Sequence, residues 1–290
     1  MVEPDFTNLA QARVAVVGLG LMGGSLALAL RGRCQTLWGV DSNPDVQAYA
    51  CQHGIIDDAT DLAGAVQADV LVLAAPARAI LAHLGELTLA PAPNGRPMVI
   101  DLGSTKTEIT AAMRQLPPGY APIGGHPMCG KEVSGLAHAE AGLFRDKVFV
   151  LTPLERTPAW ALGRALELIA AIGSRPLQLT AERHDQLAAA ASHLPYLAAT
   201  ALVRAAEELG DDQVWQMAAS GFRDTSRLAA SDVTMMTDIL LTNREAIRAA
   251  LERYQAELGT MMSLLDAADA DALAAFLAAA AERRRGMFQP

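Results

Sequence analysis

A glycine pattern placed directly after a short apolar run constrains the fold of this chain more than any other feature. Residues 13–17 read Arg-Val-Ala-Val-Val and have the β-branched character of a buried strand. The next six residues match G-x-G-x-x-G: Gly18, Leu19, Gly20, Leu21, Met22 and Gly23. A helical segment then extends from Met22 to about Arg31. A strand, a glycine turn and a helix in this order predict a unit that holds the pyrophosphate of a dinucleotide at the helix N-terminus.

An acidic residue after the next strand indicates which dinucleotide is bound. Residues 37–40 read as a second strand, and Asp41 follows it, 18 residues past Gly23. A carboxylate at this position accepts hydrogen bonds from a ribose hydroxyl and repels a 2′-phosphate. We therefore expect NAD rather than NADP as the cofactor. The structural alternatives for Asp41 are a helix N-cap and a turn residue.

Strands and helices continue to alternate up to about residue 180. Further apolar runs typical of strands lie at 69–74, 98–102, 148–151 and 176–179. This alternation predicts an α/β fold, in which a Rossmann-like, mostly parallel and doubly wound sheet occupies an N-terminal domain of residues 1–180. From residue 181 onward, helical patterns such as 246–265 and 271–285 dominate. We expect residues 181–290 to form an all-helical domain that contacts the substrate and forms a homodimer.

Composition argues against several classes of protein. The 290 residues carry a net charge of −9, and no basic cluster is longer than Arg283-Arg284-Arg285, so we expect no nucleic-acid partner. Three Cys residues, none in a C-x-x-C pair, favour a reducing compartment and argue against a disulfide or zinc framework, so we expect no bound metal. The N-terminal segment lacks an apolar core, and the apolar stretch 187–203 is interrupted by polar residues. We therefore expect a cytoplasmic protein without a membrane partner.

Four further segments carry residue types that bind ligands or react. The first is Asp-Leu-Gly-Ser-Thr-Lys at 101–106, at the carboxyl end of a predicted strand, where open α/β sheets bind their ligands. The second is Gly-Gly-His-Pro-Met-Cys-Gly-Lys-Glu at 124–132, just past another predicted strand. The third combines His184-Asp185 with Ser-His-Leu-Pro-Tyr at 192–196. The fourth is Ser-Gly-Phe-Arg-Asp-Thr-Ser-Arg at 220–227.

In this order, the segments resemble those of the prephenate/arogenate dehydrogenases of tyrosine biosynthesis. The family pattern is G-x-G-x-x-G, D-x-G-S-x-K, H-P-M-x-G, S-H-L-P and F-R-D-x-T/S-R, and all five motifs occur between Gly18 and Arg227. The resemblance implies NAD-dependent oxidative decarboxylation of prephenate to 4-hydroxyphenylpyruvate. The alternative within the family is an arogenate dehydrogenase, which forms tyrosine directly.

The resemblance also implies roles for individual side chains. His126 is implied to accept the proton of the ring hydroxyl, and Ser104 to bridge that hydroxyl, the histidine and the nicotinamide. Arg227 is implied to bind the substrate carboxylate, because a guanidinium matches a carboxylate with two hydrogen bonds. The remaining residues implied to line the substrate pocket are Ser192, Tyr196, Glu132, Asp224 and Arg223.

Each of the main candidates has a structural alternative. His126 would then only satisfy a loop hydrogen bond, and Ser104 would cap the helix that follows Thr105. Arg227 would form an ion pair with Asp224, three residues earlier on a helix.

Three neighbouring side chains are assigned less reactive roles. Cys129 lies three residues from His126, but a hydride transfer needs no covalent nucleophile, so we expect no Cys–His catalysis. His193 is expected to be structural, and His184 either to be structural or to contact the pocket.

Two departures from the family pattern leave the substrate open. Tyr196 stands where many prephenate-specific members have His, and Met236 stands where many have Trp. Other function classes fit less well. The β-hydroxyacid dehydrogenases generally rely on a helix Lys, and this chain has no Lys after Lys147. A non-catalytic NAD-binding scaffold is expected to lose His126 or Arg227, and both are present.

Overall fold

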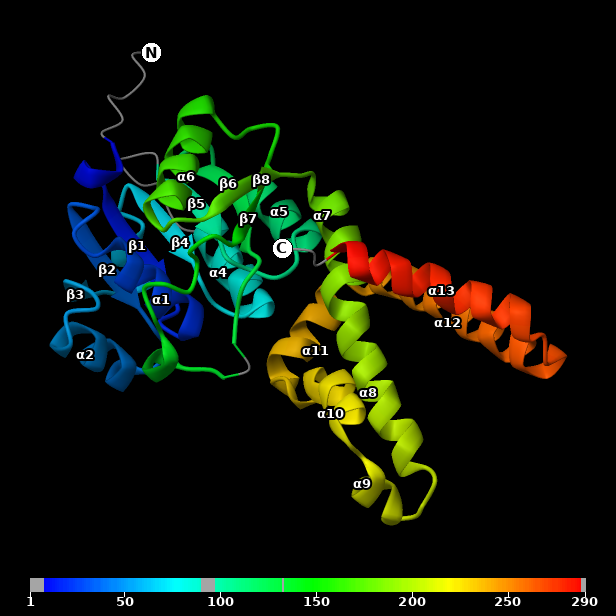
Figure 1. The fold of residues 1–290 in the computed structure, drawn as a ribbon. Helices are drawn as coiled ribbons and strands as arrows, with labels where there is room; N and C mark the ends of the chain where they lie inside the picture. The colour runs from blue at the N-terminus through cyan, green and yellow to red at the C-terminus, as the bar shows by residue number, and fades with distance from the viewer. Residues whose placement is uncertain (1–7, 90–96, 132, 288–290) are drawn as a thin grey trace.

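The first half of the protein is built around one large sheet (Figure 1). The computed structural model describes residues 8–89, 97–131 and 133–287. Eight strands follow the order β3-β2-β1-β4-β5-β6-β7-β8. Neighbouring strands run parallel except β6 and β7, which pair antiparallel. The strands are β1 (Arg13–Val17), β2 (Thr36–Val40), β3 (Asp58–Ala59), β4 (Val70–Leu73), β5 (Met98–Asp101), β6 (Ala121–Pro127), β7 (Val148–Pro153) and β8 (Arg175–Gln178).

Helices cover both faces of the sheet, which confirms the predicted doubly wound fold. Along β1, Val14 and Val16 pack with α1 and α6, whereas Ala15 and Val17 pack on the opposite face with α3, α4 and α5. Burial of both faces explains why the strand sequences are apolar almost without interruption. The helices of this half are α1 (Leu21–Leu30), α2 (Pro44–Gln52), α3 (Leu62–Ala65), α4 (Ala77–Leu89), α5 (Thr107–Arg114) and α6 (Ala159–Ala171).

The second half is helical, as predicted. Thr180 caps the first helix by accepting a hydrogen bond from the N–H of Arg183. A π-helical turn at Ala189–His193 then joins α7 to α8. Pro195, at the start of α8, has no N–H to donate to the preceding turn, and this accounts for the irregularity. The helices are α7 (Ala181–Ala188), α8 (Leu194–Glu207), α9 (Gln213–Met217), α10 (Ser220–Ser226), α11 (Val233–Thr242), α12 (Arg244–Ala267) and α13 (Ala270–Met287).

The helical half projects from the sheet in two arms (Figure 1). One arm contains α8 with α9 and α10, and the other is the hairpin of α12 and α13. Among the described residues, the buried cluster of this half consists of Ala189, Ile247 and Ala250, and partly buried apolar side chains of α8, α11 and α12 pack against it. Within the part of the chain that the structure describes, none of the helices has the length and apolarity that a membrane crossing needs.

Two features of the sheet differ from the sequence prediction. The two-residue strand β3 has no clear sequence signal. The strand expected to end before residue 124 continues through Pro127, so His126 lies within β6 rather than after it. Pairing of this stretch with β7 from Ile123 to Pro127 explains the extension, because ladder contacts outweigh the low strand preference of glycine and proline.

Candidate active site

The glycine turn after β1 has the geometry that a dinucleotide pyrophosphate requires. Gly18 has a φ of +94°, and an added Cβ would lie 2.6 Å from the carbonyl oxygen of Ala74. A Cβ on Gly23 would overlap the carbonyl oxygen of Gly18. A Cβ on Gly20, by contrast, would meet no non-adjacent atom of the described chain within 4 Å. Protein packing therefore requires the first and third glycines, while the second leaves the N-terminus of α1 accessible to a ligand.

Asp41 joins the end of β2 to this turn. Its carboxylate accepts hydrogen bonds from the N–H of Leu19 at 2.8 Å and from the N–H of Asn43 at 2.9 Å. Asn43 is the N-cap of α2, so the helix-cap alternative for Asp41 is wrong. The alternative of a turn residue is present, because Asp41 accepts the N–H of Asn43 two residues later. Within the glycine turn, Leu19 and Leu21 are buried in the core and Met22 packs against it. Asp41 thus fixes the turn and places a carboxylate beside it.

Asp101, the last residue of β5, organises the next part of the site. Its carboxylate accepts hydrogen bonds from the N–H of Gly103 at 2.8 Å and from the N–H of Gly125 at 3.0 Å. It also forms an ion pair with the ammonium of Lys106, and both side chains are fully buried. Burial lowers the pKa of Lys106, and the charge and hydrogen bond of Asp101 oppose this effect. The carboxylate therefore links the turn that carries Ser104 to the strand that carries the histidine.

His126 on β6 contacts a second histidine on α7. Its Nδ1 lies 2.7 Å from Nε2 of His184, and the two rings meet edge to face. Burial lowers the pKa of His126 well below its ordinary value, and the nearby His184, Lys106 and His193 lower it further. The ring of His126 is therefore neutral near pH 7 and able to accept a proton.

Asp185 completes a chain of hydrogen bonds behind His126. Its Oδ1 lies 2.8 Å from Nδ1 of His184. The same carboxylate accepts hydrogen bonds from the N–H groups of Lys106 at 2.7 Å and Thr107 at 2.8 Å, at the N-terminus of α5. The hydrogen bonds thus run from His126 on β6, through His184 and Asp185 on α7, to the N-terminus of α5.

Asn243 and His193 pack behind this chain. The side-chain amide of Asn243 donates to the carbonyl oxygen of Asp185 at 2.9 Å and lies 3.2 Å from Nδ1 of His193. His193 is buried, which lowers its pKa to about 4 despite the opposing charge of Asp185. This arrangement agrees with the structural role expected for His193.

The residues implied to bind substrate lie on neighbouring elements of the helical half. Arg223 and Asp224 are exposed on α10 and form an ion pair at 3.3 Å. Arg227 begins the 3-10 turn Arg227–Ala230. Both α10 and this turn pack against α8, whose first turns carry Tyr196.

Three further predicted site residues differ in their settings. Ser192 is exposed within the π-helical turn. Ser104 is half-buried between β5 and α5, and the N-cap of α5 is Lys106, so the N-cap alternative for Ser104 is wrong. Glu132 lies outside the described residues.

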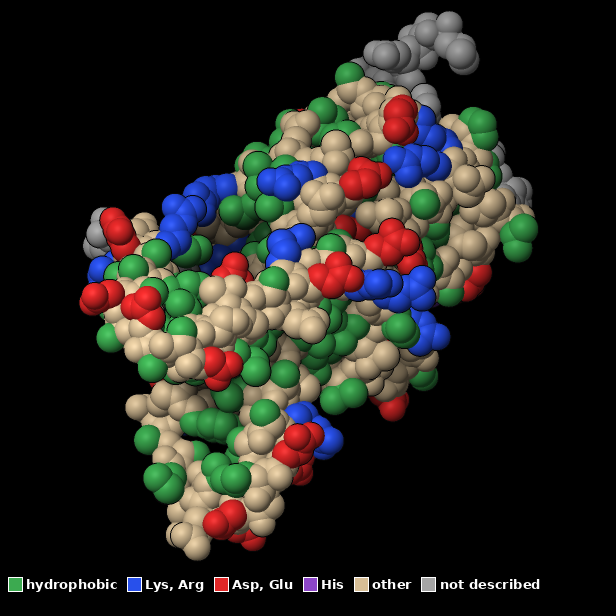
Figure 2. All heavy atoms as spheres, turned by 90° about the vertical axis from the view of Figure 1, so that its right-hand side faces the viewer, with side chains coloured by type: hydrophobic (Ala, Val, Ile, Leu, Met, Phe, Trp, Pro, Cys, Tyr) green, Lys and Arg blue, Asp and Glu red, His purple; other side chains and the backbone are tan. Residues whose placement is uncertain are grey.

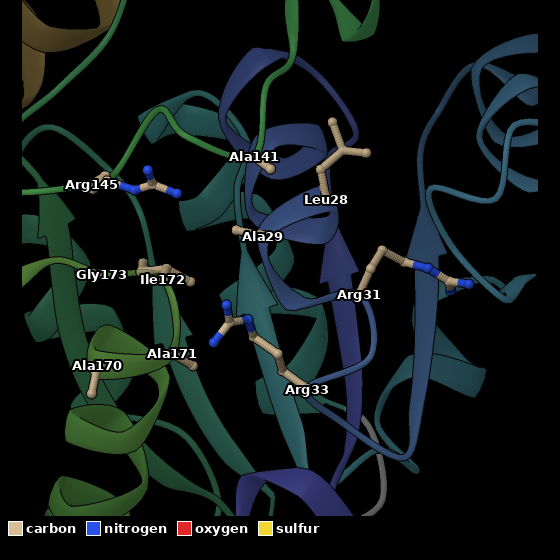
Figure 3. Close-up of a pocket in the computed structure, with 10 residues that line it drawn as sticks. All are labelled: Leu28, Ala29, Arg31, Arg33, Ala141, Arg145, Ala170, Ala171, Ile172 and Gly173. Carbon is tan, nitrogen blue, oxygen red and sulfur yellow. The ribbon is translucent and has the colours of Figure 1, made fainter.

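No group of three or more metal-ligating side chains occurs among the described residues. A cavity of about 310 Å³ lies at the carboxyl end of α1, between that helix, the end of α6 and the turn near Arg145 (Figure 3). Because the glycine turn lies at the amino end of α1, this cavity is separate from the candidate active site.

The sequence singles out His184-Asp185 as a pair but assigns neither residue a part in catalysis. No spacing rule connects His184 to His126, which lies 58 residues earlier. Only the packing of α7 against the sheet half brings the two rings together.

The glycine turn at the carboxyl edge of a parallel sheet, with a neutral and partly buried histidine on another strand, defines a dinucleotide-dependent dehydrogenase. Residues 26–177 match the model of the prephenate dehydrogenase nucleotide-binding domain, and residues 180–279 match that of the prephenate dehydrogenase dimerization domain. The chain belongs to the prephenate dehydrogenase family.

The similarity to individual relatives extends along almost the whole chain. Prephenate dehydrogenase of Bacillus subtilis is 30% identical over 287 residues, which cover 97% of this chain and 77% of the relative. The structure of prephenate dehydrogenase from Aquifex aeolicus with hydroxyphenyl propionate and NAD⁺ has a TM-score of 0.89 and 29% identity, and the match covers 97% of this chain and 100% of that one. Arogenate dehydrogenase of Synechocystis has a TM-score of 0.82 and 31% identity, covering 95% and 100% of the two chains.

Proposed function

We propose that this protein catalyses the NAD-dependent oxidative decarboxylation of prephenate to 4-hydroxyphenylpyruvate. The chain belongs to this family, and the observation that carries the proposal is its His126 ring, which burial keeps neutral. A neutral imidazole is the proton acceptor that oxidation of a ring hydroxyl requires.

The chemistry needs a base that takes a proton and later returns it. His126 accepts the hydroxyl proton as the ring carbon that bears the hydroxyl becomes a carbonyl. When bound, NAD⁺ supplies the acceptor for the hydride that leaves the same carbon. The carbonyl withdraws electrons from the opposite carbon, the bond to its carboxylate breaks, and the ring becomes aromatic as CO₂ leaves. The phenol oxygen then takes the proton back from His126, so this step releases no net proton.

Other side chains bind and orient the substrate in this proposal. Ser104, which is half-buried beside β5, would hydrogen-bond the substrate hydroxyl next to the bound dinucleotide. Arg227 binds a substrate carboxylate through its planar guanidinium. The other residues proposed to bind the substrate are Ser192, Tyr196, Asp224 and Arg223, and the family motif adds Glu132.

The glycine turn is proposed to bind NAD through Gly18 to Gly23. The open space beside Gly20 supports close approach of the pyrophosphate. Asp41 has two backbone partners, and each of its oxygens retains capacity to accept a ribose hydroxyl. Its negative charge opposes the 2′-phosphate of NADP.

Arogenate is the second candidate substrate. Tyr196 is half-buried near the start of α8 and offers a hydroxyl where many prephenate-specific relatives have a histidine. The similarity to the Synechocystis arogenate dehydrogenase also supports this candidate. A β-hydroxyacid substrate is disfavoured, because no Lys follows Lys147 in the chain.

Steady-state assays of both substrates with NAD⁺ and NADP⁺ test the proposed function. We expect turnover of prephenate with NAD⁺ and a much lower kcat/KM with NADP⁺. Higher kcat/KM with arogenate would reassign the substrate, and turnover of neither substrate would overturn the proposed function.

A homodimer formed through residues 181–290 is also proposed. The helical half has a small core, yet it exposes many large apolar side chains, and Figure 2 shows green apolar atoms extending between the charged ones. They include Trp215, Met217, Leu258, Met262 and Leu265. A second copy of the chain is the occupant favoured by the matching dimerization domain. Light scattering after size-exclusion chromatography should give twice the monomer mass of 30.5 kDa.

The chain is proposed to divide into two domains and to work in the cytoplasm. We place the nucleotide-binding domain at residues 1–180 and the helical domain at 181–290, because Thr180 caps the first helix of the second half. The unpaired thiols Cys34, Cys51 and Cys129 support a reducing, cytoplasmic environment.

A further inference from the structure

We propose that Asp185 is a positioning residue for the reaction, and that it acts through His184 to fix the tautomer of His126 with a free Nε2. This inference rests on the proposed function only for the role of His126 as the base. It concerns two residues on α7 that contact the sheet half, and it follows from which atoms in the chain can donate a hydrogen bond.

Asp185 carries a negative charge at the end of the hydrogen-bonded chain. Burial alone would raise the pKa of its carboxyl, but hydrogen bonds from His184, Thr107 and Lys106 outweigh that effect and lower the pKa. The two backbone N–H groups belong to the start of α5, where the helix dipole also favours an anion. Asp185 is therefore ionised near neutral pH, and an ionised carboxylate only accepts hydrogen bonds.

The charge of Asp185 sets the positions of the protons along the hydrogen-bonded chain. Because the carboxylate of Asp185 only accepts, Nδ1 of His184 must carry the proton of the 2.8 Å hydrogen bond. In a neutral His184 ring, Nε2 is then an acceptor. When both rings are neutral, Nδ1 of His126, which lies 2.7 Å away, is therefore the donor. The proton of a neutral His126 is placed on Nδ1, and the lone pair is left on Nε2.

A fixed tautomer prepares His126 for the proton transfer. A base whose free nitrogen is fixed before the substrate arrives needs no ring flip or proton exchange before the transfer. After His126 has accepted a proton on Nε2, its Nδ1–H still donates to His184, and the charge of Asp185 stabilises the resulting cation. Without this anion, His184 has two tautomers of similar energy, and one of them turns His126 into a poor base.

The tautomer can be measured directly in the wild-type protein without any substrate. Nitrogen-15 NMR of labelled histidine distinguishes a protonated from an unprotonated ring nitrogen. The chain has six His residues, and the spectrum of a His126→Asn variant identifies the relevant signals. We expect neutral His126 to carry its proton on Nδ1. A proton on Nε2 in the wild-type protein would overturn the proposal, whatever the substrate proves to be.

Two variants test the consequence for catalysis. Asp185→Asn should mix the tautomers of His126 and lower kcat by about 10²-fold or more, with little change in KM. Asp238→Asn is a matched control, because buried Asp238 also reaches from the helical half to a helix N-terminus, where it accepts a hydrogen bond from the N–H of Arg78 at 3.4 Å. This control should retain the His126 tautomer and a kcat near that of the wild type. Full kcat in folded Asp185→Asn, or an equal loss in both variants, would contradict the proposal.

Discussion

The ammonium of Lys106 reaches back to the carboxylate of Asp101, and the two fully buried side chains form an ion pair beneath the strand that carries His126. The same carboxylate binds the N–H of Gly125, the residue before that histidine. The pair therefore joins two motifs that are separate in sequence, and the charge of Lys106 lowers the pKa of His126.

Removing one partner of this pair should be more harmful than removing both. Lys106→Met or Asp101→Asn leaves an uncompensated buried group, and we expect each change to lower the free energy of unfolding by about 3–5 kcal/mol. The double variant should lose less than the sum of the two single losses. Urea unfolding of all four proteins measures this coupling, and additive losses would show that the pair does not act as a unit.

The glycine turn offers a test that separates folding from cofactor binding. Gly18→Ala introduces a Cβ 2.6 Å from Ala74 O at a φ of +94°, so it should lower stability by about 1–3 kcal/mol. Gly20→Ala meets no such obstacle, and we expect stability within about 0.5 kcal/mol of the wild type. Its affinity for NAD⁺ should nevertheless fall by about tenfold or more, or ~1.4 kcal/mol. Thermal unfolding and NAD⁺ titration check both expectations, and unchanged NAD⁺ affinity in Gly20→Ala would place the pyrophosphate elsewhere.

The pH dependence of the reaction should reflect the lowered pKa of His126. Burial is the largest cause, and the neighbouring His184, Lys106 and His193 act in the same direction. The neutral ring accepts the proton, so a lowered pKa keeps the base active as the pH falls through its ordinary value of ~6.5. We expect the acid limb of kcat/KM to lie below that pH. Activity regained at neutral pH after brief exposure to each test pH shows that denaturation does not cause the loss of rate. An acid limb at or above pH ~6.5 would contradict the expected direction of the pKa shift.

The sequence identifies much of the fold because local signals agree with the final packing. The predicted strand 13–17 has the same bounds as β1, since its apolar residues and the glycines that follow describe a complete βα unit. The stretch that continues β6 through Pro127 is different, because its glycines and prolines are poor strand formers. Its pairing with β7 is a tertiary interaction that local sequence does not express.

The site is predictable to a similar extent. Motifs locate His126 and the glycine turn, because the required chemistry restricts their residue types. The contact between His126 and His184 depends instead on how α7 docks on the sheet half. The carboxylate of Asp185 is likewise held by backbone N–H groups, which carry no sequence signature.

Arg227 is expected to act mainly in substrate binding. Arg227→Ala should raise KM for prephenate by about tenfold to a hundredfold, because hydrogen bonds to a charged group are worth ~1.5–3 kcal/mol. Arg204→Ala provides a matched control, since Arg204 is an exposed arginine on α8 that pairs with Glu207 at 3.0 Å. Steady-state kinetics of both variants decide the assignment. A normal KM in Arg227→Ala would move the carboxylate site to another residue.

The most direct test of the central claim is the kcat of His126→Asn with prephenate and NAD⁺, measured beside its affinity for NAD⁺. General-base catalysis contributes about 10²–10⁴-fold, so we predict a loss of kcat in that range. Affinity for NAD⁺ should remain near that of the wild type, because the glycine turn follows β1, whereas His126 lies on β6. Wild-type kcat in the folded variant would contradict the assignment of His126 as the proton acceptor.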